Sequence, residues 1–266
     1  ASSLVLLSFV HAAVAQTSAR RDILSYAGEK RYWVVQVVPP GTRNAKSTQS
    51  EIRTRESAGV VAWRRVAILQ GRVIDIAHRD ADAAVLFDDQ SWLLVWPGGS
   101  STGPRLPGAA VLRALGSDEQ SLWSLGVHAA PATQPVERQA TTQPATPITP
   151  GTLQTFLFAG GRWQPRAAAP PEFTNDKPMS FAVFDSRPMI AWQSAERELR
   201  FIALRRDGTW APVESIKTDF AITDFRLLAR APTPTVWMAG KSSAGELRTR
   251  REAWSPSIPL QAEPHM

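Results

Sequence analysis

A short pattern recurs along the chain at spacings of 46 and 48 residues, and once at 101 residues, which is about two periods; it restricts the possible folds more than any other feature. Glu-Leu-Arg at residues 198–200 returns at 246–248, which is 48 positions later. Glu-Ile-Arg occupies residues 51–53, and a looser copy, Thr-Leu-Gln, lies at 152–154, 46 positions before residue 198. A unit of this size cannot bury its apolar residues alone, so several units must pack against one another.

Tryptophan marks two further positions in the unit. A turn and then a Trp follow each copy of the pattern, at Trp63, Trp163, Trp210 and Trp254. Apolar runs with Trp occur at residues 92–96, 121–125, 189–192 and 235–238. A further apolar run stands before each of them, at 73–77, 110–115, 181–184 and 225–229. The unit therefore predicts four short strands.

Local chemistry favours strands and tight turns over helices. Leu199 and Phe201 alternate with polar Arg200, a period of two that is typical of a strand. Asp-Gly at 207–208 and Gly-Gly at 160–161 are tight-turn sequences because Gly tolerates positive φ. Pro (21) outnumbers Gly (16), and Pro disfavours helix interiors and central strands. We therefore predict an all-β chain with sheets at 23–70, 71–108, 109–169, 178–217 and 219–261.

Arg-Asp-Gly-Thr-Trp at residues 206–210, followed by Ala-Pro-Val, has weaker relatives around Trp163 and Trp254. On these residues the chain resembles the β-propeller superfamily of secreted bacterial proteins. It does not match the Asp-box of sialidases, because Arg205 and Asp207 occupy the positions of its Asp and Gly. The resemblance implies a β-propeller over residues 16–266 with about five four-stranded blades, which could be an incomplete ring.

Two segments stand outside the repeat. Residues 130–151 are rich in Pro, Thr, Gln and Ala, so we expect a flexible insertion between two strands of the third blade. Residues 41–50 are a shorter polar insertion in the first blade. An apolar run at 4–10 precedes the small-residue sequence Ala13-Val14-Ala15, as in the second half of a signal peptide. We therefore expect residues 1–15 to be a signal peptide that lacks its n-region, and the protein to be exported to the periplasm or beyond.

Few residues in the chain could carry catalysis or bind a metal. Cys is absent, and His78 and His128 are the two histidines away from the ends of the chain, so neither a thiolate site nor a typical zinc site is expected. No Gly-x-Ser-x-Gly occurs. Asp80 and Asp82 could ligate calcium, but the other ligands of a calcium loop are missing, so we interpret them as turn residues. We assign no catalytic, cofactor-binding or metal-binding residue.

The glycine-rich run at 98–103 has no Lys and no following helix, so we interpret it as a hairpin connection and not a phosphate site. The regular tryptophans are expected to pack between blades rather than to bind sugars. Trp33 and Trp92 fit the repeat least well, so they are the two that we expect to be exposed.

These features favour a non-enzymatic, extracytoplasmic binding module for a protein or glycan ligand. A carbohydrate-active hydrolase or lyase is one alternative, and the sensor part of a larger membrane-anchored protein is another. The formal charge of +6 comes from scattered basic pairs, such as Arg64-Arg65 and Arg205-Arg206, so no nucleic-acid partner is expected. No segment is long enough to span a membrane. Because Met and basic residues do not precede Ala1, a larger parent polypeptide is also compatible with the sequence.

Overall fold

The computed structural model describes residues 23–27, 31–41, 47–56, 62–79, 82–118, 121–128, 151–173, 177–228, 233–241, 245–250, 254–256 and 258–260. These residues form strands β1 to β20 and one short 3-10 turn, η1 (Pro107–Ala109). Within this part of the chain, no helix has the length and apolar character needed to cross a lipid bilayer.

The strands form five antiparallel sheets of four, here called blades 1 to 5, and each is built from consecutive strands. Blade 1 contains β1 (Ile23–Ala27), β2 (Arg31–Val38), β3 (Gln49–Glu56) and β4 (Arg64–Gln70). Blade 2 contains β5 (Val73–Arg79), β6 (Asp82–Phe87), β7 (Trp92–Trp96) and β8 (Gly99–Thr102). Blade 3 contains β9 (Ala110–Ser117), β10 (Leu122–His128), β11 (Leu153–Ala159) and β12 (Arg162–Ala168). Blade 4 contains β13 (Met179–Phe184), β14 (Arg187–Ala195), β15 (Glu198–Ala203) and β16 (Glu214–Lys217). Blade 5 contains β17 (Asp224–Leu228), β18 (Thr235–Ala239), β19 (Gly245–Thr249) and β20 (Ile258–Leu260).

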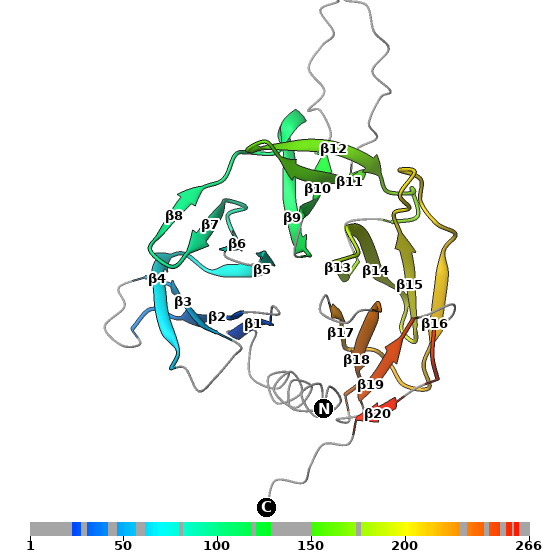
Figure 1. Cartoon of the computed structure of the whole chain (residues 1–266). Helices are drawn as coiled ribbons and strands as arrows, with labels where there is room; N and C mark the ends of the chain where they lie inside the picture. The colour runs from blue at the N-terminus through cyan, green and yellow to red at the C-terminus, as the bar shows by residue number, and fades with distance from the viewer. Residues whose placement is uncertain are drawn as a thin grey trace, which may run out of the picture.

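The blades follow one another around a ring, with the first strand of each blade near the centre (Figure 1). The inner strands β1, β5, β9, β13 and β17 pack against one another in this order. Among the described strands, β17 does not pack against β1 in the same way. The predicted all-β propeller and its five blade boundaries are confirmed.

Strand periodicity explains why the blades need one another. In β14, Ile190 and Trp192 pack in the cluster shared with blade 3, whereas Met189 and Ala191 pack in the cluster shared with blade 5. Successive side chains of a strand point to opposite faces, so each apolar strand of a middle blade contributes to two interfaces. Four apolar clusters lie at the four interfaces between consecutive blades.

Tryptophans lie in each of these interfaces, as the repeat predicts. Trp33 packs between blades 1 and 2, and both Trp92 and Trp163 pack between blades 2 and 3. Trp123, Trp192 and the partly buried Trp210 lie in the cluster between blades 3 and 4, and the partly buried Trp254 packs against the cluster between blades 4 and 5. An indole buries a large apolar area, so these side chains contribute much of the stability of the contacts between blades.

The prediction that Trp33 and Trp92 are exposed is wrong, because their exposed fractions are 0% and 3%. The cause is that one apolar run was assigned to the wrong strand of its blade. The run at 92–96 is the third strand of its blade, whereas the runs at 121–125, 189–192 and 235–238 form second strands. Trp33 lies on the second strand of blade 1, as Trp123 and Trp192 do in theirs, and is therefore a regular member of the repeat.

The predicted turns and insertions have mixed outcomes. Gly160, Gly161 and Gly208 have φ of 60°, 73° and 82°, so both tight turns are confirmed. In the run at 98–103 only the start is a turn, and residues 99–102 form β8 because they pair with β7. Residues 130–150 and the predicted signal peptide at 1–15 lie outside the described residues, as do residues 42–46 of the shorter insertion. The longer insertion does fall between β10 and β11 of blade 3.

Candidate functional site

The repeated Glu-x-Arg pattern places an ion pair on the third strand of three blades. Residues two apart on a strand share a face, so the carboxylate and the guanidinium meet. The pairs are Glu51–Arg53 at 3.0 Å, Glu198–Arg200 at 3.4 Å and Glu246–Arg248 at 3.0 Å. The apolar residue between the two packs on the opposite face, as Leu199 does against blade 5. Each ion pair therefore lies on the opposite face of its sheet. In a middle blade this is the face turned toward the preceding blade.

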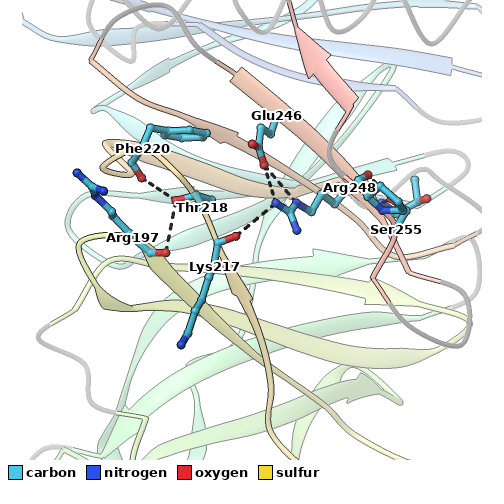
Figure 2. A network of polar contacts seen from close by, with 9 residues as sticks. Arg197, Lys217, Thr218, Phe220, Glu246, Arg248 and Ser255 are labelled. Carbon is cyan, nitrogen blue, oxygen red and sulfur yellow. Dashed lines mark hydrogen bonds and ion pairs between the residues drawn. The ribbon is translucent and has the colours of Figure 1, made fainter.

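In blade 5 the pair holds two blades together. Arg248 donates from Nη2 to Glu246 and also to the carbonyl of Lys217, at the end of the outer strand of blade 4 (Figure 2). The side chain of Arg248 is only 19% exposed. Nearby, Arg250 donates from Nε to Glu214 of blade 4 at 2.7 Å, which raises the pKa of Arg250 above its ordinary value. These arginines are structural connectors.

The pair in blade 4 is more accessible. The hydroxyl of Ser194 donates to Glu198 at 2.5 Å, and this bond, with the charge of Arg200, lowers the pKa of Glu198. Arg200 keeps 43% of its side chain exposed. The carboxylate is thus held in its ionised form, while the guanidinium reaches solvent.

Blade 1 has, besides its ion pair, a second arginine that contacts two aromatic rings. The guanidinium carbon of Arg55 lies 4.9 Å from the ring centroids of both Tyr32 and Trp63. Such cation–π contacts hold a guanidinium in place without neutralising its charge. Trp63 and Arg53 are each 40% exposed. We call these four residues, together with Glu51, the blade 1 cluster.

Trp63 is exposed because of its place in the ring. In blades 3 and 4 the Trp after the repeated pattern reaches the preceding blade. There Trp163 donates from Nε1 to the carbonyl of Pro104 at 3.1 Å, and Trp210 donates to that of Ala168 at 2.6 Å. Trp63 is the copy of these residues in blade 1, and no described blade packs on that side of it. Sequence reasoning identified Trp63 as a repeat residue and missed its exposure, since the pattern is the same in all copies.

A buried aspartate on an inner strand accepts hydrogen bonds from the backbone. Asp75 on β5 accepts the N–H groups of Ile76 and of Leu115 on β9, at 2.9 and 2.8 Å. Burial raises the pKa of Asp75 to about 6, although these bonds and the charge of Arg226 oppose the shift. Sequence reasoning did not single out Asp75, yet an acidic residue within an apolar inner strand was an available signal. The bond from Leu115 connects blade 2 to blade 3, whereas the bond from Ile76 lies within β5.

The two internal histidines do not form a shared site. His78 lies on β5 of blade 2, whereas His128 lies on β10 of blade 3 and contacts Gln154 Oε1 through Nε2 at 2.5 Å. In the described part of the chain, no three His, Asp or Glu side chains are grouped so that they could hold a metal ion.

The aspartates around β6 behave as structural residues where they are described. Asp82 pairs with Arg79 at 2.9 Å at the two ends of the β5–β6 hairpin, whereas Asp80 lies outside the described residues. Asp89 accepts the N–H and the hydroxyl of Ser91, which is a turn arrangement and lowers the pKa of Asp89.

No protein-family model and no curated protein matches this chain. Solved structures do match it. A fucose-recognising lectin from Aleuria aurantia, a six-bladed β-propeller, has a TM-score of 0.54 and 11% identity, over 90% of this chain and 78% of the lectin. SapL1 lectin, solved with α-methyl fucoside, has a TM-score of 0.56 and 12% identity, over 90% and 79%. AofleA from Arthrobotrys oligospora has a TM-score of 0.53 and 11% identity, over 88% and 70%. At such low identity the likeness shows the fold, a β-propeller.

Proposed function

We propose that this propeller is a non-enzymatic glycan-binding module and that the blade 1 cluster contacts the sugar. The observation that carries the proposal is the exposed indole of Trp63, which lies against the guanidinium of Arg55 on the hairpin that also holds the Arg53–Glu51 ion pair. Lectins with the same fold, described as recognising or binding fucose, support the choice of a glycan over a protein ligand.

The chemistry of the cluster suits a sugar. The apolar C–H face of a pyranose packs on an indole ring, and its hydroxyl oxygens accept hydrogen bonds from donors such as a guanidinium. Arg53, whose side chain is 40% exposed, supplies such N–H donors, and its ion pair with the largely buried Glu51 fixes the guanidinium before a ligand arrives. Preorganised groups lose little conformational entropy on binding, which favours affinity.

Replacement of Trp63 by alanine tests this site. A glycan array on the wild-type chain, with fucosides included, identifies a neutral ligand, and titration calorimetry then measures its affinity. We expect Trp63→Ala to weaken binding about tenfold or more, because an exposed aromatic anchor typically contributes over 1 kcal/mol. The matched control is Trp96→Ala, which removes an indole of similar exposure, 38%, from blade 2.

The control is expected to leave the affinity within about twofold, since Trp96 lies outside the cluster. Equal losses in both variants would contradict the site. Absence of any glycan ligand would contradict the function, and release of new reducing sugar ends from a bound glycan would contradict the non-enzymatic assignment.

The N-terminal segment supports a further part of the proposal, namely that the protein is exported. The apolar run at 4–10 and the small residues 13–15 match a cleavable leader. With a start methionine and a basic n-region added, we expect a bacterial host to secrete a mature product that begins at Gln16. N-terminal sequencing checks this, and Ala15→Asp should block cleavage. Retention of an uncleaved wild-type chain in the cytoplasm would contradict export.

A further inference from the structure

The outer hairpin of blade 1 brings two arginines face to face. In the register of β3 and β4, Arg53 is paired with Arg65, next to a register shift between Ile52 and Arg53. Directly opposed residues of antiparallel strands have Cβ atoms about 4.5–5.5 Å apart, and like charges at such positions destabilise the sheet. Arg65 is exposed and Arg53 is 40% exposed, so both charges are turned to solvent. We expect this pairing of like charges to lower the stability of the blade, so the presence of both arginines needs an explanation other than folding.

A third guanidinium extends the same face. Arg55 is two residues beyond Arg53 on β3 and is therefore on the same side of the strand. Its position between the rings of Tyr32 and Trp63 fixes it beside an exposed indole. Three arginines and an aromatic ring thus share one surface, where Glu51 pairs with Arg53.

The corresponding hairpins of the other blades lack this opposition of charges. In blade 4, the residue opposite Arg200 is Ser215. In blade 5, Arg248 is committed to Glu246 and the Lys217 carbonyl. The opposed arginines are therefore not required by the blade architecture, since the same architecture is built without them.

We infer that the β3–β4 hairpin of blade 1 binds a polysaccharide that carries carboxylate or sulfate groups. This inference rests on the proposed glycan-binding function and specifies the class of glycan. An anionic group between Arg53 and Arg65 relieves their repulsion and forms charge-assisted hydrogen bonds with both. The adjacent indole of Trp63 provides a stacking surface for a neighbouring sugar ring. An acidic sugar polymer combines both features in one ligand.

The test uses the full chain and three probes. Dextran sulfate presents sulfates, polygalacturonate presents carboxylates, and unmodified dextran presents neither. At constant ionic strength we expect wild type to bind at least one anionic polymer about tenfold or more tightly than dextran, with affinity that falls as salt is added. A difference between the two anionic polymers shows which group the hairpin prefers.

Charge reversal at one residue then locates the site. Arg65→Glu places a carboxylate opposite Arg53, which favours the folded sheet, so loss of binding cannot be ascribed to unfolding. We expect about tenfold weaker binding of the anionic polymer but at most about threefold weaker binding of the neutral glycan, because the new carboxylate engages Arg53 and repels only the anionic ligand. The matched control is Arg205→Glu, the same reversal at an exposed arginine of blade 4. It should change the affinity less than about twofold.

Each other result overturns the inference. Equal losses in Arg65→Glu and Arg205→Glu would mean that net charge alone drives binding. Single-stranded DNA bound as tightly, with the same dependence on Arg65, would mean a general polyanion site. Binding of neutral glycans but of neither anionic polymer would reject the inference and leave the proposed function intact, whereas binding of no glycan would reject the proposed function itself.

Discussion

Replacement of Trp192 by alanine is expected to lower the free energy of unfolding by about 3–5 kcal/mol. The side chain is fully buried and packs against Phe173, in the cluster between blades 3 and 4 that also contains Trp123. Alanine removes this contact and leaves a cavity that the rigid sheets cannot fill by collapse. Urea unfolding followed by circular dichroism measures the change.

Trp63→Ala is the matched control for this experiment, because it removes the same side chain from an exposed position. We expect it to change the free energy of unfolding by less than about 1 kcal/mol. Similar losses in the two variants would mean that the interface tryptophans do not hold the blades together. That result would contradict the role of packing between blades in the stability of the ring.

Gly103→Ala is expected to cost about 3 kcal/mol, at the upper end of the range for an overpacked site. A Cβ atom at residue 103 would lie 1.9 Å from Cε2 of the Trp92 indole. The indole has no room to move, because it contacts Phe158 and Trp163 and donates from Nε1 to the Pro104 carbonyl. Relief of the clash therefore requires a shift of the chain after β8 or loss of this packing.

Gly99→Ala is the control, since it also places a methyl group beside an indole. There the nearest atom is 3.1 Å away and belongs to Trp96, which is partly exposed and can move. We expect a cost below about 1 kcal/mol. In a double-mutant cycle, most of the cost of Gly103→Ala should disappear when Trp92 is already alanine. Additive costs would show that the clash with Trp92 is not the cause.

One repeated pattern has different uses in different blades. The Glu-x-Arg pair connects two blades in blade 5, where Arg248 reaches the Lys217 carbonyl. In blade 1 the pair stands beside exposed Trp63 and opposite Arg65. The difference arises from the neighbours of each blade, because the local strand geometry is the same. A function inferred from the pattern alone would have been assigned to every copy.

Most of the architecture could be predicted from the sequence because it depends on local chemistry. The alternation around Leu199 and Phe201 predicts a strand from neighbouring residues alone, and Gly208 predicts its turn from backbone freedom. The spacing of the repeat placed the five blade boundaries, since each unit has the same four strands. The pattern did not show which of the four strands each apolar run forms, and the run at 92–96 was therefore assigned to the wrong strand.

The exposure of each tryptophan and the composition of the candidate site were decided by tertiary structure. Whether an indole is buried depends on a second sheet that lies far away in sequence, so the pattern gave the wrong result for both Trp33, which is buried, and Trp63, which is exposed. The opposition of Arg53 and Arg65 depends in the same way on strand register, which the β3–β4 pairing sets. The sequence by itself determined how many strands form and where they turn, because those are local properties. Only the packed ring decided which faces reach solvent, because burial is a property of two surfaces that meet.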